Sequence, residues 1–300
     1  MKNVLVIYYS QSGQLAEIAR NVSRPFLENP DYHVDFHEIK PLTPFPFPWD
    51  SDSFFGAFPE SFLQEPMALE PVPSDMLTKN YDLILFHYQV WYLSPSIPVN
   101  SFLKSEEGKS ILRGKPVITV SGSRNMWVMA QEKVKVLLRE ARSDLKGNIA
   151  LVDRVGNLIS VLTIVEWMFS GKKTKKWGIL PLPGVSDTDI RDSAKFGEII
   201  KARFESNSFH DLQPELVKND AVRISSYLVL VDRTGNKIFN KWSKFIKSRK
   251  SGRKTWLKLF YVYLFLAIWV ISPIVYILHL LTYPLKINKI KRETLYYQGV

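Results

Sequence analysis

The N-terminal two thirds of the chain alternates short apolar runs with segments of helical spacing. Continuous apolar runs of this length are typical of strands buried on both faces of a parallel sheet. Such runs lie at residues 4–8, 83–86, 117–120 and 149–152, and residues 33–37 form a further strand candidate in which apolar and polar residues alternate. Helical spacing follows at residues 15–27, 98–104, 126–142 and 190–204. The pattern predicts an α/β fold with a doubly wound, parallel, five-stranded sheet.

Residues 41–74 interrupt this alternation with a segment rich in proline and aromatic residues. Between Pro41 and Pro73 lie 8 of the 18 prolines, which prevents long regular structure. Its aromatic side chains are Phe45, Phe47, Trp49, Phe54, Phe55, Phe58 and Phe62. So many aromatic residues predict a packed insertion over the sheet edge. It is either a lid over a hydrophobic ligand or a loop that fills a small core of its own.

The C-terminal region contains a stretch, residues 259–285, without any Lys, Arg, Asp or Glu. An uncharged apolar run of this length predicts a membrane segment, and its Tyr and Trp residues near the ends suit the headgroup region. As one helix it would be about 40 Å long, against about 30 Å for the hydrocarbon core. Two interpretations stay open: a single span, or a hairpin that turns near Ser272-Pro273. Basic residues on both flanks favour the hairpin.

Positive charge is concentrated around this segment. The net charge is +11, and 14 of the 40 Lys and Arg residues lie between Arg233 and Arg292, where no acidic residue occurs. Within residues 207–258, a linker and basic helix, one face carries Ile238, Phe239, Trp242, Phe245 and Ile246. Residues 286–300 form a basic tail. This arrangement predicts contact with an anionic membrane surface, and the apolar run makes nucleic acid an unsuitable partner.

A shorter apolar segment at 158–169 precedes Lys172, Lys173, Lys175 and Lys176. Its length fits a buried helix as well as an interfacial one. The chain opens directly on a strand pattern, so no signal peptide is expected, and the predicted location is the cytoplasmic face of the inner membrane.

The absence of cysteine excludes disulfides, thiol nucleophiles and thiolate metal sites. His33 and His37 lie in a strand-like alternation, where this spacing does not bring two ligands to one metal ion. No metal site is therefore expected.

A turn between the first strand and the first helix is the most informative motif. It comprises Tyr9, Ser10, Gln11, Ser12, Gly13, Gln14 and Leu15. Backbone N–H groups of a tight turn and a helix N-terminus bind phosphate without a cation. The two serine hydroxyls are further donors, and the glycine permits close approach. The turn is neither a Walker loop nor a dinucleotide-binding Gly-x-Gly-x-x-Gly motif.

This turn resembles the phosphate loop of the flavodoxin-like family, although Leu15 replaces the usual final threonine. The resemblance covers residues 1–206 and implies a bound FMN. Two later loops, at residues 88–98 and 121–127, follow the third and fourth predicted strands (83–86 and 117–120) in the manner of the family. The positions implied to hold FMN are Ser10, Gln11, Ser12, Gly13, Gln14, Leu15, Gln89, Val90, Trp91, Tyr92, Ser121, Gly122, Ser123 and Trp127.

A closer resemblance is to the subgroup labelled dialkylresorcinol condensing enzyme. It shares Tyr-Ser-Gln-Ser-Gly-Gln at residues 9–14, Ser-Gly-Ser-Arg-Asn-Met-Trp at 121–127 and a basic, hydrophobic C-terminus. It implies an FMN-dependent aromatase that oxidises a lipophilic dialkyl cyclohexane-1,3-dione, made by a partner ketosynthase, to a dialkylresorcinol of flexirubin-type pigments. Candidate proton-handling groups are His87, Tyr88, Tyr92 and Arg124.

Alternative functions stay open at this point. One is a membrane-associated NAD(P)H:quinone oxidoreductase, which would bind NAD(P)H over the flavin. Others are a tethered electron carrier and a scaffold without flavin. Association of the chain with further copies of itself, as a homo-oligomer, also stays open.

Overall fold

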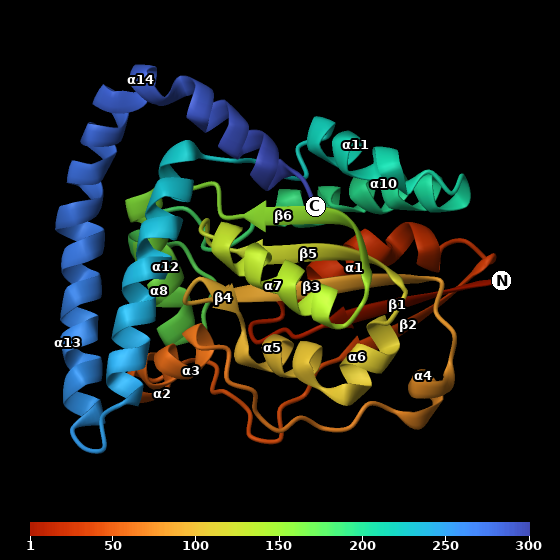
Figure 1. Ribbon diagram of the computed structural model, residues 1–300, viewed down its shortest axis with the longest axis horizontal. Coiled ribbons are helices and arrows are strands. Elements are labelled where there is room, and N and C mark those ends of the chain that lie inside the picture. The colour runs from red at the N-terminus through yellow and green to blue at the C-terminus, as the bar shows by residue number, and fades with distance from the viewer.

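Five parallel strands form the central sheet of the computed structural model, which describes residues 1–300 (Figure 1). Their order is β2-β1-β3-β5-β6, and a short β4 pairs antiparallel with the end of β3. The strands are β1 (Lys2–Tyr8), β2 (Tyr32–Glu38), β3 (Leu83–Trp91), β4 (Ser94–Pro95), β5 (Pro116–Ser123) and β6 (Asp144–Val152). When the five long strands are numbered along the chain, their order in the sheet is 2-1-3-4-5, which is the order of flavodoxin-like sheets. The fold is flavodoxin-like, which confirms the predicted class.

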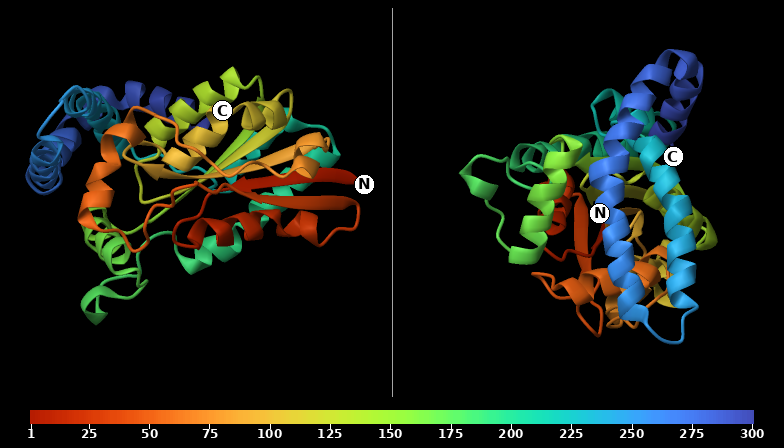
Figure 2. Two further views of the ribbon diagram at one scale, coloured as in Figure 1. Left: turned by 90° about the horizontal axis from the view of Figure 1, so that it is seen from below. Right: turned by 90° about the vertical axis from the view of Figure 1, so that its left-hand side faces the viewer.

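Helices cover both faces of the sheet (Figure 2). One face is covered by α1 (Gln14–Leu27), α9 (Asp187–Asp192), α10 (Ala194–Glu205) and α11 (Leu212–Lys218). The other is covered by α5 (Ile97–Lys104), α6 (Glu106–Leu112) and α7 (Val128–Glu140). Alternate strand residues point to opposite faces, so Leu83 and Leu85 pack towards α1 while Ile84 and Phe86 pack towards α5. Both faces are apolar, as the continuous apolar runs predicted.

The globular domain extends past residue 206, where the sequence analysis placed the start of a linker. Leu212 and Leu216 of α11 are fully buried against β6. Gln213 accepts a hydrogen bond from the backbone N–H of Asn148 at 2.7 Å. Residues 207–225 therefore pack on the globular domain and are part of it.

The proline-rich insertion is packed, as predicted, at the end of the molecule where the strands terminate (Figure 1). It forms α2 (Ser51–Gly56) and α3 (Phe58–Phe62), and α4 (Ser74–Thr78) follows it. Phe58 of α3 stacks on Phe260 from the C-terminal helices, with ring centroids 3.7 Å apart. The insertion thus has a small core of its own, but that core includes distant parts of the chain.

Three helices lie beyond the carboxyl ends of the strands: α8 (Asn157–Ser170), α12 (Ser226–Lys247) and α13 (Arg253–Leu266). The last helix, α14 (Ser272–Gln298), begins there, contains Pro284, and bends back so that its C-terminal end lies beside β6 (Figure 1). A π-helical turn, Ala267–Ile271, joins α13 to α14, and short 3₁₀ turns occur at Lys176–Gly178 and Phe209–Asp211. The helix 253–298 is the one segment long and apolar enough to cross a membrane.

The chain does not turn at Ser272-Pro273, in contrast to the predicted hairpin. It reverses at residues 248–252, between α12 and α13, where Gly252 adopts a positive φ of 73°. Proline lacks the N–H that an α-helix needs and its ring presses on the preceding turn. The π-helical turn before Pro273 accommodates this proline, so the helix continues.

The apolar face of α12 is docked on protein and is not free for a bilayer, which corrects the prediction for this helix. Phe239, Trp242 and Phe245 pack against α13 and the insertion. Ile246 at the end of that face is 1% exposed. The lysines of α12 remain on the outer side.

Candidate active site

The three predicted loops meet in one cavity of about 480 Å³ at the carboxyl ends of the strands. In open α/β sheets ligands bind at this edge, where the order of the strands reverses. The predicted residues that line the cavity are Gln11, Ser12, Gln14, Leu15, Gln89, Val90, Trp91, Tyr92, Gly122, Ser123 and Arg124. The tertiary structure therefore brings together residues from all three loops.

The first loop borders this space through Gln11, Ser12, Gln14 and Leu15, whereas Ser10 and Gly13 are not among the lining residues. Gly13 precedes α1 with a φ of 87°, a conformation that favours glycine, and as the N-cap residue it has no side chain to cap the helix. The Ser10 hydroxyl accepts a hydrogen bond from the N–H of Ala16 at 3.2 Å. The N–H groups of Gln14 and Leu15 remain, and together with the positive end of the dipole of this 14-residue helix they can bind an anion.

Two glutamines of the first loop hold neighbouring segments in place. The Gln11 side chain donates to the carbonyl of Pro46 at 2.9 Å and accepts from the indole N–H of Trp49 at 3.1 Å. Gln14 exchanges two hydrogen bonds with the backbone of Val185, each at 3.0 Å. These side chains fix the insertion and the loop before α9, which leaves the backbone of the turn for a ligand.

Leu15, which replaces the threonine of the family motif, points into the core. It is 4% exposed. A Cβ on Gly122 of β5 would lie only 3.0 Å from its Cδ1. Leu15 therefore forms part of the packing between α1 and β5, and its side chain is not a phosphate donor.

The second loop is a tight turn between β3 and β4. Tyr92 and Leu93 both have positive φ, 48° and 60°, which is the geometry of a type I′ turn. The Tyr92 hydroxyl donates to the carbonyl of Phe54 at 2.7 Å. Trp91 meets Trp49 edge to face, with centroids 5.3 Å apart. The loop is thus tied to the insertion, and both form an aromatic wall.

The third loop joins the sheet to α8 through Arg124. Its guanidinium donates to the carbonyl and the side-chain oxygen of Asn157 and to the Ser160 hydroxyl, each at 3.0 Å. Burial lowers the pKa of Arg124 to about 10, with the nearby Asp153 carboxylate acting in the opposite direction. Arg124 remains the one guanidinium on the cavity wall.

His87, Tyr88 and Ser121 do not reach the cavity, because their strands are longer than the sequence predicted. β3 continues to Trp91 and β5 to Ser123, so these three residues lie inside the sheet and are fully buried. Burial lowers the pKa of His87 to about 4. The Tyr88 hydroxyl donates to Gln131 at 2.8 Å. Neither side chain is placed for proton transfer to a ligand in the cavity.

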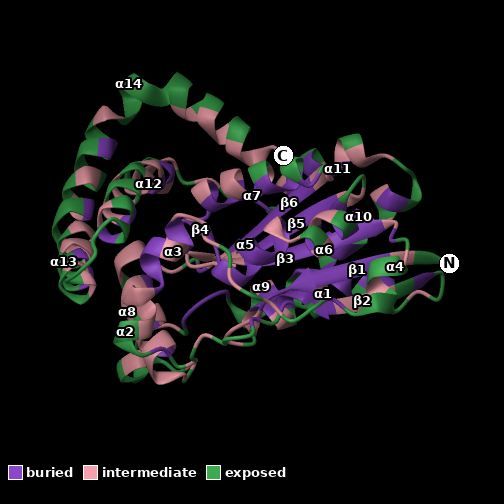
Figure 3. Ribbon diagram, turned by 60° about the horizontal axis from the view of Figure 1, so that its bottom comes forward, coloured by how far each residue is buried: buried purple, intermediate pink, exposed green.

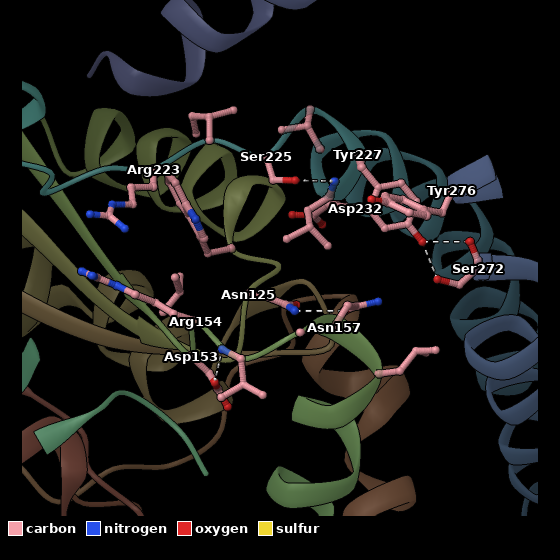
Figure 4. Close-up of a pocket in the computed structure, with 18 of the residues that line it drawn as sticks. Asn125, Asp153, Arg154, Asn157, Arg223, Ser225, Tyr227, Asp232, Ser272 and Tyr276 are labelled. Carbon is pink, nitrogen blue, oxygen red and sulfur yellow. Dashed lines mark hydrogen bonds between the residues drawn. The ribbon is translucent and has the colours of Figure 1, made fainter. Parts of the chain in front are cut away.

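Trp127 lines a second, larger cavity of about 770 Å³ between the β6–α8 loop, α12 and α14 (Figure 4). Asn125 and Asn157 separate the two spaces through a hydrogen bond of 2.9 Å. On its wall, Asp232 is fully buried and accepts from the N–H of Met129 at 3.2 Å, and burial raises its pKa to about 7. This larger cavity lacks the phosphate loop, so the smaller one is the candidate active site.

Sequence reasoning missed more than half of the walls of the candidate site. These walls come from the insertion, α8 and the 3₁₀ turn after it, and α13 and the π-helical turn after it. Their residues are Phe47, Trp49, Phe54, Phe55, Val161, Leu162, Ile164, Val165, Trp167, Met168, Lys176, Tyr261, Leu264, Phe265, Ile268 and Trp269. No local motif marks these positions, since all but Lys176 are ordinary apolar or aromatic residues of their own segments. The one available signal was the density of aromatic residues in the insertion.

No protein-family model matches the chain, and no curated protein matches it either. Among solved structures it is similar to a flavoprotein from Lactobacillus acidophilus NCFM in complex with FMN, with 19% identity, a TM-score of 0.40, and 50% of this chain and 93% of that chain covered. A flavodoxin from the domain Archaea shows 14% identity, a TM-score of 0.39, and coverage of 68% and 99%. A WrbA-like flavodoxin protein from Agrobacterium tumefaciens shows 12% identity and a TM-score of 0.38, and the match covers 69% of this chain and 99% of that chain. At these scores, the strand order carries the fold assignment.

Proposed function

We propose that this cavity binds FMN and that the chain is a membrane-associated oxidoreductase that aromatises a dialkyl cyclohexane-1,3-dione. The observation that carries the proposal is the convergence of an open helix N-terminus and an aromatic, apolar cavity. The buried side-chain nitrogen of Gln89 and the Ser123 hydroxyl have no hydrogen-bond partner. Both residues line the cavity, so the polar edge of a bound flavin ring would supply the hydrogen-bond partners that these two groups lack.

The phosphate of FMN fits the first loop, and the ring fits between Trp91 and the third loop. When bound, FMN supplies a two-electron acceptor. The residues of the chain do the rest. Apolar side chains from the insertion, α8 and α13 exclude water and hold two alkyl tails, and Arg124 provides positive charge for an enolate oxygen.

Aromatisation removes two hydrogens from the dione ring, one as a hydride and one as a proton, and leaves the resorcinol. The titratable side chains on the wall, apart from Arg124, are Tyr92, Lys176 and Tyr261. Tyr92 donates its proton to a carbonyl, and Lys176 pairs with Glu166 at 2.9 Å. Tyr261 is half-exposed, so it is the residue we assign to proton release towards solvent.

The test begins with the full-length protein in detergent and the identification of any released cofactor. Anaerobic addition of a dialkyl cyclohexane-1,3-dione is expected to bleach the flavin absorbance, with one resorcinol formed per FMN. Bleaching by NAD(P)H but not by the dione would replace the aromatase with a quinone oxidoreductase. A colourless protein that takes up no FMN would overturn both.

Gly13→Ala tests the phosphate loop, and Gly114→Ala is its matched control. Both glycines have positive φ, 87° and 69°, and an added Cβ would meet nothing within 4 Å at either site. Each substitution therefore costs about 1–2 kcal/mol of backbone strain. In the Gly13→Ala protein without FMN, the loop can relax to an unstrained conformation. FMN binding then has to return the loop to the strained conformation, and this cost raises the Kd of FMN by about 5- to 30-fold. Gly114, at the other end of the sheet, leaves the Kd unchanged.

A further inference from the structure

Both ends of the apolar helix 253–298 are attached to the same globular domain. At its start, the Arg253 guanidinium donates to the Glu60 carboxylate at 2.7 Å. At its end, the Tyr296 hydroxyl donates to Glu132 at 2.8 Å, and the carbonyl of Gln298 accepts from Gln213 at 2.6 Å. A single span would place these two ends on opposite sides of a hydrocarbon core about 30 Å thick. The two attachments are incompatible with that arrangement.

Between its attached ends the helix has one packed side and one bare side. The packed side faces α12, where Tyr227 donates to the carbonyl of Ser272 at 2.9 Å and Ser226 meets His279 at 3.0 Å. Only 11% of the most apolar window is buried (Figure 3). Large apolar side chains on the bare side include Leu259, Val262, Leu266, Val270, Ile274, Ile277, Leu278, Leu281 and Leu285. An apolar surface of this length is far larger than soluble monomers expose.

A second bare apolar surface lies on α8, at the same end of the molecule as α13 (Figures 1 and 2). Only Ser160, Thr163 and Trp167 of this helix are buried. Ile159 and Val165 are 42% and 45% exposed. The loop that follows exposes Trp177 and Ile179 by 71% and 81%. Exposed tryptophan next to lysine is typical of a segment at a lipid headgroup layer.

The mouth of the candidate site lies between these two surfaces. Val165 of α8 and Tyr261 and Phe265 of α13 line the cavity, yet they are 45%, 50% and 52% exposed. Residues that both line a cavity and face the outside mark its opening. The opening is therefore flanked by two apolar helices.

We propose that α8 and the 253–298 helix rest in the plane of one bilayer leaflet, and that the cavity opens between them into the lipid. The proposal rests on the proposed function for its substrate class: a long-chain molecule dissolved in the bilayer enters sideways without crossing water. Basic residues flank both apolar segments along the chain, among them Lys172, Lys175, Lys258, Lys286, Lys291 and Arg292. Their charge complements anionic headgroups, so the occupant is an anionic bilayer surface.

Because the chain has no cysteine, a single introduced cysteine can be labelled at a chosen position. A test based on such labels does not depend on bound flavin. Val165→Cys, Val262→Cys and Leu281→Cys carry a polarity-sensitive fluorophore. Leu27→Cys, at the end of α1 beside the amino ends of the strands and 50% exposed, is the control. When vesicles of phosphatidylcholine and phosphatidylglycerol are added, the fluorescence emission of the three labels is expected to shift to shorter wavelength, and that of the control label is expected to stay unchanged. A Val165 label that stays in water would overturn the opening between the helices.

Topology is tested on Lys254→Cys and Arg292→Cys protein added to preformed vesicles. An impermeant maleimide outside the vesicles is expected to modify both sites at equal rates. Protection of the Arg292 site until detergent is added would show a span and overturn the in-plane arrangement.

Substrate entry is tested with Phe265→Asp at the mouth and Leu281→Asp, which is 71% exposed and lies away from the cavity, as the matched control. In vesicles, Phe265→Asp is expected to slow flavin reduction by a long-chain dione at least about tenfold, while Leu281→Asp changes it less than about threefold. Equal losses in both variants would overturn lipid entry at this mouth, whereas absence of FMN from all variants would refute the proposed function instead.

Discussion

The stacked pair Phe58 and Phe260 connects the insertion to the wall of the candidate site, which makes Phe260→Ala an informative perturbation. Both side chains are fully buried, with rings 3.7 Å apart at an angle of 8°. Leu264 and Phe265, which line the cavity, follow one helical turn later. Removing the ring of Phe260 therefore loosens α13 where it encloses the cavity.

The magnitude follows from burial. Truncating a buried phenylalanine to alanine costs about 3–5 kcal/mol, including the contact between the rings. The cluster around Phe260 is separate from the two cores that flank the sheet. Most of the loss thus falls on the docking of α12 and α13 onto the insertion. A loss of about 3 kcal/mol raises the population in which these helices are detached by about 100-fold.

Hydrogen–deuterium exchange of the protein in detergent measures this effect. Amides of α3 and α13 are expected to exchange faster in Phe260→Ala, while those of β1 and β3 keep their protection. Val262→Ala, two residues along the same helix but 50% exposed, is the control and leaves both regions unchanged. Equal acceleration in the strands, or none in α13, would refute the view that this pair holds the cavity wall independently of the sheet.

Three further substitutions test single side chains. The pKa of Asp232 is raised from 3.8 to about 7, so the native state binds a proton that the unfolded chain lacks between these values, and stability falls as pH rises through that window. Asp232→Asn should therefore raise the denaturation midpoint at pH 8 and leave it nearly unchanged at pH 5; a loss at pH 8 would contradict this. Leu15→Thr is expected to lower stability by about 2 kcal/mol without tightening FMN, because Leu15 packs on Gly122, and a lower Kd in a fluorescence titration would argue otherwise. Tyr92→Phe loses the hydrogen bond to Phe54, about 1 kcal/mol, but should change the rate of flavin reduction less than about threefold; a 100-fold loss would identify Tyr92 as a proton donor.

Much of the fold follows from local sequence. Apolar runs such as residues 4–8 can be satisfied only between two helical layers, so they determine the parallel sheet and its order of elements. The turn at Ser10–Gly13 depends on glycine and on the helix that begins behind it, and both are local features. The uncharged stretch at 259–285 is also evident from composition alone. These features could be predicted because each depends on neighbours within a few residues.

Tertiary structure decided which of the predicted residues reach the site and what else encloses it. His87 and Tyr88 fell inside the sheet because pairing with β5 carries β3 on to Trp91, and strand length is set by partner strands. The aromatic insertion closes the cavity only because Phe58 finds Phe260, about two hundred residues later in the chain. The two ends of the apolar helix meet one domain because Arg253 and Tyr296 find acidic partners there. Such long-range contacts leave no pattern in local sequence, because their free energy arises only when the folded sheet brings distant segments together.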